Sequence, residues 1–400
     1  MSFPAYPVTD RQKKLVALAA ELADTFAQRV AQHDWEGSFA YENYEDLRTS
    51  GYLTLTVPRD FGGWGADLLE AVLAQQRLAQ GDASTALVMS MHLNNMARFG
   101  ASVTGPNAFY EELCRAVVDD GAIINTAASE PATGSPSRGG RFNTTARRQD
   151  DGTWIVNGRK TYTTGSPILT HFIVNCSIED TTSPTAKEQL PPLNSDRGNI
   201  LVARTTPGVR VETTWNSVAM RGSGSNDLIL ENVHVPADSW IEQQLPTNPA
   251  AQGRVAAWQL VTTAVYHGIA DGARTEAIRF AKQRRPNSLD RPISSLPHIQ
   301  EKAAKIELLM MQSRAVLYGL AAQFDSDPES IAPSQCAAAK YIVTNHAVEV
   351  VDLAMRLVGA ASLSLNSPLQ RYYRDVRAGL SNPPMDDATI ATLGRQVLEG

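Results

Sequence analysis

Apolar positions along the chain change from helical spacing to strand-like runs and back to helical spacing. Near the N-terminus they recur every three or four residues, which predicts amphipathic helices. Thr9 stands where it would cap the first helix, and Ser50-Gly51 would end the second. We expect helices within residues 9–50, including one over 41–49, and over 67–80 and 83–99. Residues 52–65 read as a short extended run followed by a loop with three glycines.

The middle of the chain carries short runs of β-type residues. Asn157-Gly158 lies between two of these runs, and this dipeptide predicts the turn of a β-hairpin. Residues 177–197 contain proline, serine, threonine and asparagine, and read as a solvated loop insertion. We expect strands over 122–127, 153–156, 171–175, 199–203, 209–213 and 227–231.

The last third of the chain returns to helical spacing. The expected helices cover residues 255–283, 298–318, 334–357, 369–378 and 388–398. Helices, then strands, then helices indicate an α+β protein. We therefore expect an N-terminal α-helical domain (1–120), a central β-domain (121–240) and a C-terminal α-helical bundle (241–400). No Gly-x-Gly-x-x-Gly follows a strand, so the sequence does not indicate a Rossmann site.

Composition and charge narrow the classes of function. The chain has 400 residues, 43% of them apolar, and a net charge of −6 at pH 7. That charge offers no electrostatic footprint for nucleic acid or an anionic membrane. Cys114, Cys176 and Cys336 lie far apart, which indicates buried thiols in a reducing compartment and no metal site. Without a signal-peptide pattern or an apolar run of membrane-spanning length, we expect a cytoplasmic protein.

Candidate chemistry is concentrated between Asn125 and Gly165. A small, hydroxylated loop carries Ser129, Thr133 and Ser135, with Pro131 and Gly134 as breakers of regular structure. The expected hairpin delivers Tyr162, Thr163 and Thr164 beside that loop. Such a surface suits a flat, polar, ring-bearing ligand. The alternative is an ordinary β-hairpin with polar loops.

These residues resemble the acyl-CoA dehydrogenase family of flavoproteins. Its loop reads Thr-Glu-Pro-x-x-Gly-Ser-Asp and its hairpin Asn-Gly-x-Lys-x-Trp-Ile-Thr-Asn, and both match here in order and spacing. Residues 51–65 are similar to a second family signature, with Phe61 in place of a tyrosine. Segments 220–227 and 233–236 resemble two further landmarks. The resemblance implies an N-terminal helical domain, a central β-barrel-like domain and a C-terminal four-helix bundle.

The resemblance implies a bound flavin, FAD or alternatively FMN. In the family the loop and the hairpin hold the ring system, and Tyr162 stands where a tryptophan usually covers it. Ser135 matches a serine that touches both the flavin and the acyl thioester. Arg284 matches an arginine on the adenine side, although the residues after it differ. The cofactor-binding residues so implied are Thr126, Ala128, Ser129, Ser135, Tyr162, Thr163, Thr164, Arg284, Arg356 and Gly359.

The catalytic base of the family is missing. A dehydrogenase in this family removes the α-proton of an acyl-CoA with a glutamate, and counting along the chain puts that position at Pro383 or Met385. The alternative family position, near Trp258, has no acid either. Asp386 and Asp387 are the nearest carboxylates. They are candidate catalytic residues, and the alternative is that they cap the final helix.

His92 and Arg221 complete the set of candidate residues. His92 lies in a His-x-Asn-Asn cluster on an otherwise apolar helix, where it is either a hydrogen-bonded core histidine or a catalytic and substrate-binding residue. Arg221 belongs to the segment that resembles the family's Gly-x-Arg-x-Ser, and we assign it to substrate binding with Ser135 and His92.

Three functions compete on this basis. The first, which the landmarks favour, is α,β-dehydrogenation of an acyl-CoA or acyl-carrier thioester in fatty acid metabolism. It implies electron-transfer flavoprotein or another acceptor as partner, and a homotetramer or homodimer. The second is a two-component monooxygenase of the same fold, which uses reduced flavin and dioxygen and needs no glutamate. The third is a ligand-binding relative that has lost its base.

Overall fold

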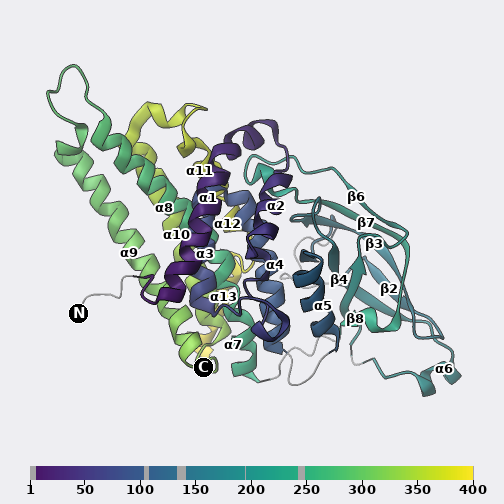
Figure 1. The fold of residues 1–400 in the computed structure, drawn as a ribbon. Helices are drawn as coiled ribbons and strands as arrows, with labels where there is room; N and C mark the ends of the chain where they lie inside the picture. Colours follow the sequence, from purple (N-terminus) through teal and green to yellow (C-terminus); the bar gives the residue numbers. More distant parts are fainter. Residues whose placement is uncertain (1–5, 103–107, 133–140, 194, 242–247, 400) are drawn as a thin grey trace.

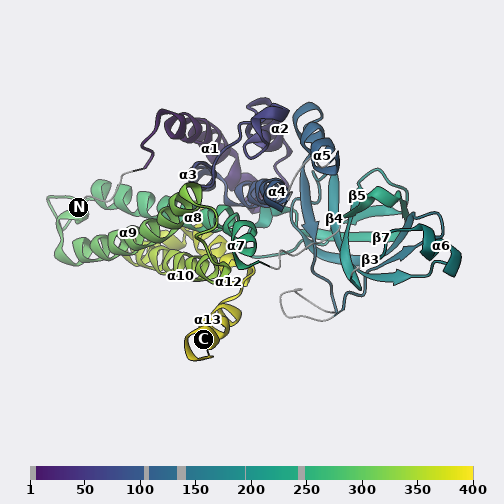
Figure 2. The same ribbon diagram turned by 90° about the horizontal axis from the view of Figure 1, so that it is seen from below.

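A computed structural model describes the chain except for residues 1–5, 103–107, 133–140, 194, 242–247 and 400. Helices from both ends of the chain form one body, and the central sheet lies beside it (Figures 1 and 2). The three-domain α+β fold expected from the sequence is confirmed.

The N-terminal helices are α1 (Asp10–Glu36), α2 (Tyr41–Thr49), α3 (Leu68–Gly81), α4 (Ala83–Ser102) and α5 (Ala108–Asp119). Thr9 caps α1 in a capping box with Gln12, as its position predicts. Asp67 caps α3 in the same way with Glu70. Helix α5 was not among the expected elements.

The extended run expected at the start of residues 52–65 is wrong. The structure has two 3₁₀ turns there, η1 (Tyr52–Thr54) and η2 (Arg59–Phe61). Tyr52, Leu53, Leu55 and Val57 are all buried. Neighbouring residues of a strand point to opposite faces, so burying Tyr52 and Leu53 together suits a tight turn enclosed by helices.

The central domain holds one mixed sheet. Its strands are β1 (Ile124–Ala127), β2 (Thr145–Arg148), β3 (Trp154–Thr163), β4 (His171–Asp180), β5 (Arg197–Ala203), β6 (Val209–Glu212), β7 (Asn226–Val235) and β8 (Trp240–Ile241). Their order is β6-β7-β3-β2-β4-β5-β8, and β1 also pairs with β4. The β1–β4 and β2–β4 pairs are parallel, and the other pairs are antiparallel.

The hairpin turn expected at Asn157-Gly158 is wrong. Both residues lie inside β3, which runs on as one strand and pairs with β7 through a local irregularity between Val156 and Gly158. Gly158 lets the backbone of β3 approach Thr144 closely, and it does not form a turn. A Cβ placed on Gly158 would lie 2.7 Å from the Cα of Thr144. The loop expected over 177–197 is partly wrong as well, because it includes the end of β4 and helix α6 (Pro184–Gln189).

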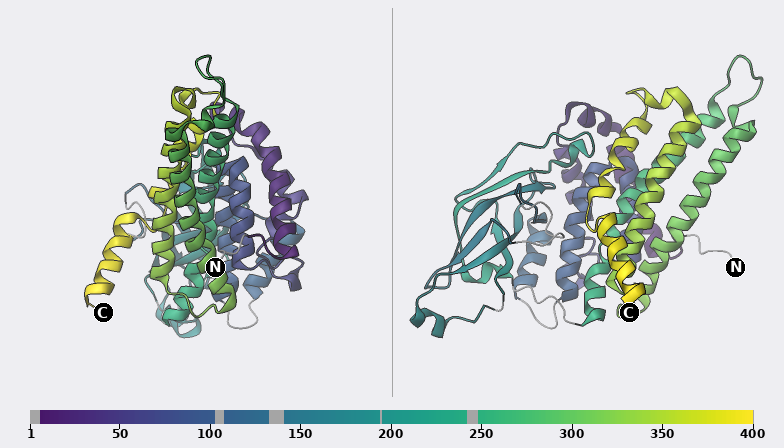
Figure 3. Two further views of the ribbon diagram at one scale, coloured as in Figure 1. Left: turned by 90° about the vertical axis from the view of Figure 1, so that its left-hand side faces the viewer. Right: turned by 180° about the vertical axis from the view of Figure 1, so that it is seen from behind.

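The C-terminal helices are α7 (Pro249–Ala257), α8 (Leu260–Gln283), α9 (Pro297–Ser326), α10 (Pro333–Val358), α11 (Pro368–Asp375), α12 (Ala378–Ser381) and α13 (Asp386–Glu399). The single helix expected over 255–283 is two helices, broken at Trp258-Gln259. Helices α8, α9 and α10 pack together, and α3 lies against α8, so the bundle crosses the expected domain boundary. Helix α13 projects away from the bundle (Figures 2 and 3).

Two simpler expectations concern the cysteines and the membrane. All three cysteines are buried and free, as predicted. Within the described ranges, no helix is both long and apolar enough to cross a bilayer.

Candidate functional site

The sheet brings the loop after β1 against the end of β3. The backbone N–H of Thr161 donates to the carbonyl of Ser129 over 2.9 Å. The side-chain amide of Asn125 donates to the carbonyl of Thr164, also over 2.9 Å. Ala128 and Ser129 therefore lie beside the Tyr162–Thr164 segment, as the sequence predicted, although these two hydrogen bonds rather than a hairpin turn join the segments.

A buried ion pair fixes this arrangement. Lys160 Nζ lies 2.7 Å from Glu130 Oε1, and the two side chains are 0% and 1% exposed. Glu130 also accepts the backbone N–H groups of Asn143 and Thr144. Burial opposes the charge, but the hydrogen bonds from Lys160 and these N–H groups outweigh it and lower the pKa of Glu130 to about 2. The Lys160 ammonium lies 4.5 Å from the ring centroid of Phe142.

A chain of hydroxyl and amide groups runs along the same edge. We call it the polar belt, and its members are Asn95, Asn125, Thr126, Thr164, Ser223 and Ser225. Thr126 Oγ1 donates to Asn95 Oδ1 over 2.9 Å, and Asn95 Nδ2 donates to Asn125 Oδ1 over 3.3 Å. On the other side, Thr164 Oγ1 lies 3.0 Å from Ser225 Oγ, which lies 2.8 Å from Ser223 Oγ.

Sequence reasoning assigned only Thr126 and Thr164 of the polar belt. Asn95 belongs to the His-x-Asn-Asn cluster, in which the sequence indicated only His92 as a candidate residue. Ser223 and Ser225 lie in the landmark segment 220–227, where Gly-Ser-Gly-Ser repeats a hydroxyl two residues apart. That spacing was the available signal for both serines.

The Tyr162–Thr164 segment has an unusual backbone. Tyr162 adopts φ 53°, in the left-handed region that aromatic residues rarely occupy, and its side chain is 68% exposed. Its ring meets Trp215 edge-on, with 6.0 Å between centroids. Thr163 is fully buried, and its hydroxyl has no hydrogen-bond partner in the described part of the chain. Strained residues of this kind cluster at ligand sites.

The residues present fit a flavin ring system. Tyr162 offers an exposed aromatic face, and Thr126, Ser129 and Thr164 offer hydroxyl groups near it. The buried Lys160–Glu130 pair holds the two segments that carry these groups. Ser135, to which the sequence gave a double role, lies outside the described residues.

His92 occupies the core. Its ring is 0% exposed, with Nε2 lying 3.0 Å from the carbonyl of Leu53 and Nδ1 accepting the N–H of Ile124 over 3.2 Å. Burial lowers the pKa of His92 to about 4, so the ring is neutral near pH 7. Both nitrogens are used by backbone groups of η1 and β1. This geometry favours the core-histidine interpretation.

The residues expected on the adenine side lie elsewhere. Arg284 follows α8 and Arg356 lies in the last turn of α10, so both are at the end of the bundle that points away from the sheet (Figures 1 and 3). Both side chains are exposed and form no ion pair with any described residue. Gly359 ends α10 with φ 76°. Within one chain, these residues are not brought together with the polar belt.

The region of the missing base contains a second polar cluster. Asp386 begins α13, its Oδ2 accepts from Asn345 over 2.9 Å, and its Oδ1 lies 3.6 Å from Lys340 Nζ. That oxygen and the Lys340 ammonium are buried without a hydrogen-bond partner among the described residues. Asp387 is exposed, and its carboxylate accepts the N–H of Ala388. The Pro383 carbonyl accepts the Gln259 side-chain amide.

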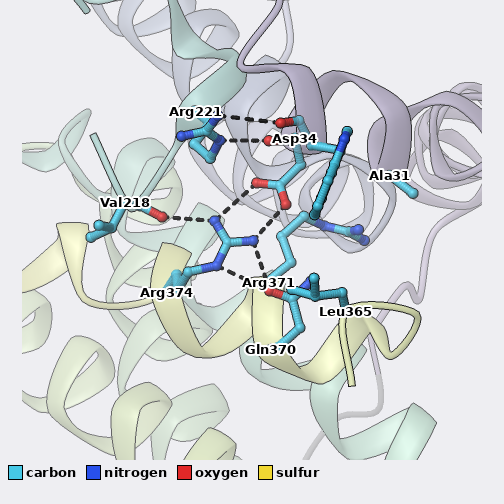
Figure 4. Close-up of a pocket in the computed structure, with 9 residues that line it drawn as sticks. Ala31, Asp34, Val218, Arg221, Leu365, Gln370, Arg371 and Arg374 are labelled. Carbon is cyan, nitrogen blue, oxygen red and sulfur yellow. Dashed lines mark hydrogen bonds and ion pairs between the residues drawn. The ribbon is translucent and has the colours of Figure 1, made fainter. Parts of the chain in front are cut away.

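Arg221 lies two residues before Ser223 of the polar belt, but its side chain lines a cavity of about 320 Å³ that no belt residue lines (Figure 4). Its Nε donates to the carbonyl of Asp34 over 2.5 Å and a terminal nitrogen to that of Ser217 over 3.3 Å. These bonds connect the end of α1 to the segment before β7. The structure does not bring Arg221 together with His92.

Comparisons with known proteins place these features in a family. Three family models match in order: "Acyl-CoA dehydrogenase, N-terminal domain" over residues 9–102, the "middle domain" over 125–233 and the "C-terminal domain" over 249–380. The chain is 41% identical over 396 residues to the putative acyl-CoA dehydrogenase YdbM of Bacillus subtilis, covering 98% of both proteins.

Other relatives have different described activities. The amino sugar nitrososynthase DnmZ of Streptomyces peucetius is 30% identical over 387 residues, covering 93% of this chain and 90% of that one. A solved structure of KijD3 with FMN and a dTDP-linked amino sugar has a TM-score of 0.84 at 26% identity. It aligns over 98% of this chain and 95% of that one.

Proposed function

The chain belongs to the acyl-CoA dehydrogenase family, and from this premise we propose that it is a flavin-dependent monooxygenase. One observation carries the proposal. Neither Pro383 nor Met385, the two positions at which the glutamate base is expected, carries a carboxylate, and the Pro383 carbonyl accepts the side-chain amide of Gln259. A monooxygenase needs no such base. The nitrososynthase relatives support this reaction class.

The balance of the reaction is simple. A bound reduced flavin would supply the two electrons that the reduction of dioxygen needs. One oxygen atom would enter the substrate, and the other would leave as water with two protons.

The residues of this chain bind and orient the ring. Tyr162 would cover one face of the flavin, and the hydroxyl groups of the polar belt would hydrogen-bond its edge. The Lys160–Glu130 pair holds the Ala128–Ser129 loop in place. Fixed hydroxyl and N–H dipoles stabilise the charge that a reduced ring carries.

Two arginines at the end of the bundle far from the sheet bear on whether the flavin is FAD or FMN. Arg284 and Arg356 are exposed and free of ion pairs within the described chain, so they are available to a diphosphate, which supports FAD. The FMN in the KijD3 structure supports the alternative. Mass analysis of the cofactor extracted from purified protein distinguishes the two forms.

A second candidate function is dehydrogenation of an acyl thioester, with Asp386 as base. The observation that favours it is Oδ1 of Asp386, which is buried without a hydrogen-bond partner among the described residues and forms an ion pair of 3.6 Å with the Lys340 ammonium. Removal of an α-proton by this oxygen would accompany hydride transfer to the flavin. The relationship to YdbM supports this candidate. In that case an electron-transfer flavoprotein or similar acceptor would reoxidise the enzyme.

One pair of measurements separates the candidates. Flavin-loaded protein is first mixed anaerobically with acyl-CoAs of several chain lengths. The monooxygenase proposal expects the oxidised-flavin absorbance to persist with every one of them. Protein with chemically reduced flavin then receives isotopically labelled dioxygen and a panel of amines and thioethers, and mass spectrometry detects one labelled oxygen atom in a product.

Each result has a defined meaning. Bleaching by any acyl-CoA would overturn the monooxygenase proposal. In that case Asp386→Asn should abolish the bleaching while flavin stays bound, and Asp387→Asn is the matched control that retains it. A protein that is colourless and cannot be reconstituted with FAD or FMN would contradict both candidates.

A further inference from the structure

The cavity beside Arg221 has no part in the function proposed above. Asp34 and Trp35 reach it from the end of α1, Arg221 from the turn before β7, and Arg371 and Arg374 from α11 (Figure 4). We propose that this cavity binds a phosphorylated ligand with a planar ring, of the nucleoside diphosphate class. The proposal is independent of the monooxygenase and dehydrogenase assignments.

The charge of the cavity is the first argument. Three guanidinium groups line it, and Asp34 is the acidic residue on its wall. Asp34 is already used, because its two oxygens face the two terminal nitrogens of Arg374 over 3.1 and 2.5 Å. Arg221 donates to backbone carbonyls, which satisfy its N–H groups without neutralising its charge. The cavity therefore carries an excess of positive charge.

Arg371 is the second argument. Its side chain is only 8% exposed, and it forms no ion pair in the described part of the chain. Its guanidinium lies 5.5 Å from the ring centroid of Tyr372. Burying an unpaired charge is costly, and an anion in the cavity would offset that cost. Arginine also matches the geometry of phosphate oxygens, to which it donates two parallel hydrogen bonds.

Neighbouring carboxylates do not fill this role. Asp375, one turn further along α11, is 3% exposed and accepts the N–H of Met220 over 2.6 Å. No ion pair within 4 Å joins it to Arg371 among the described residues, although the Arg371 guanidinium attracts this carboxyl over a longer distance. Asp34 is held by Arg374, as described.

The rim of the cavity is the third argument, because it favours a planar ring. Trp35 is 70% exposed, Val218 73% and Leu365 66%. Large apolar side chains exposed together around a polar centre mark a binding site more often than an ordinary surface. An indole face stacks on a nucleobase, while the guanidinium groups below would bind its phosphates. A cavity of about 320 Å³ is in the size range of small-molecule sites.

The test uses ADP and inorganic pyrophosphate as probes, with binding measured by titration calorimetry. The protein is saturated with flavin beforehand, so that the adenine side of the flavin site is occupied. We expect both probes to bind, and Arg371→Met to weaken both at least tenfold. Trp35→Ala should weaken ADP and leave pyrophosphate unchanged, because only ADP carries a ring. Arg279→Met removes an exposed arginine elsewhere and is the control for net charge.

Three results would overturn the proposal. One is the absence of binding of either probe at millimolar concentration. Another is equal affinity in the wild type and Arg371→Met. The third is loss of ADP binding in Arg284→Met with no effect of Arg371→Met. That result would show that the measured heat comes from ADP binding at the flavin site. Thermal unfolding shows whether each variant is folded. If Arg371→Met does not fold, Trp35→Ala still tests the proposal, because Trp35 is exposed and its replacement should not disturb the fold.

Discussion

Glu130 and Lys160 carry opposite charges where water reaches neither side chain. Glu130→Gln leaves the Lys160 ammonium buried without a counter-ion, and breaking such a pair costs about 3–5 kcal/mol of unfolding free energy. We expect that loss in urea denaturation, together with weaker flavin binding, because the pair holds the loop that carries Ser129.

The double variant tests whether charge is the cause. Glu130→Gln with Lys160→Met removes both charges, and we expect it to recover part of the stability that the single variant loses. Glu301→Gln breaks the exposed pair with Lys305 and should cost less than about 1 kcal/mol. If Glu130→Gln proved no more harmful than Glu301→Gln, the assigned role of the buried pair would be wrong.

Asp375 predicts a pH dependence of stability. Burial raises the pKa of Asp375 from its ordinary value of 3.8 to about 7. Between these values the folded protein holds a proton that the unfolded chain has released, so stability falls as pH rises through this window. Asp375→Asn stays neutral and can still accept the N–H of Met220. We therefore expect the wild type to lose about 2–3 kcal/mol relative to Asp375→Asn from pH 5 to pH 7.

Denaturant unfolding of both proteins at several pH values measures that difference. His92 acts in the opposite direction, because its pKa is lowered to about 4 and its neutral form is favoured in the folded state. It is present in both proteins, so its contribution cancels. A difference that stays constant from pH 5 to pH 7 would show that Asp375 does not titrate there.

Strand β3 depends on one glycine inside it. Gly158→Ala places a methyl group 2.7 Å from the Cα of Thr144, and the contact can be relieved only by moving a backbone segment. We expect a loss of about 1–3 kcal/mol, as for overpacked cores, and weaker flavin binding because β3 delivers Tyr162. Gly319→Ala is the matched control. Nothing lies within 4 Å of its added methyl group, in the middle of α9, so we expect it to stabilise by up to about 1 kcal/mol. Equal effects of the two variants in thermal unfolding would contradict the clash.

The sequence predicted those elements that are determined by residues close together in the chain. Thr9 caps α1 as its position indicates, the helix expected from Asp67 is present as α3, and the strand runs are in place. The failures come from contacts distant in sequence. Asn157-Gly158 has the composition of a turn, yet partners from β2 and β7 hold it extended. The break in the helix at Trp258-Gln259 has no proline or glycine, so the pattern gave no reason to expect it.

The candidate site was predictable to the extent that it is local. The loop at Ser129 and the segment at Tyr162 carry their chemistry in neighbouring residues, and the sheet brings them together. Ser223 and Ser225 reach the polar belt only through the pairing of β3 with β7, which no local pattern shows. The orphan polar atoms of Lys340 and Asp386 come from different helices and needed the structure for the same reason.

The molecule exposes large apolar side chains on its C-terminal helices. Helix α13 has 14 residues and buries only Thr389 among those described, while Ile390, Val397 and Leu398 are 56%, 81% and 86% exposed. Helices this short are marginal in water without tertiary packing. A second copy of the chain is the partner that the surface implies, since Leu308 and Met311 on α9 are exposed as well. We therefore predict a homodimer or homotetramer in which α13 is packed.

Light scattering after size-exclusion chromatography measures this directly. Val397→Glu with Leu398→Glu puts two charges on the apolar side of α13, so burial in an interface would become costly and the mass should fall toward that of one chain. Gln396→Glu adds charge at an exposed polar position of the same helix and should leave the mass unchanged. Asp386 begins α13 and is the candidate base for acyl-CoA dehydrogenation. If a dissociated variant oxidised acyl-CoA at an unchanged rate, Asp386 would act without the packing of this helix. A wild type with the mass of one chain would refute the prediction, and α13 would then be expected to exchange its amide protons rapidly.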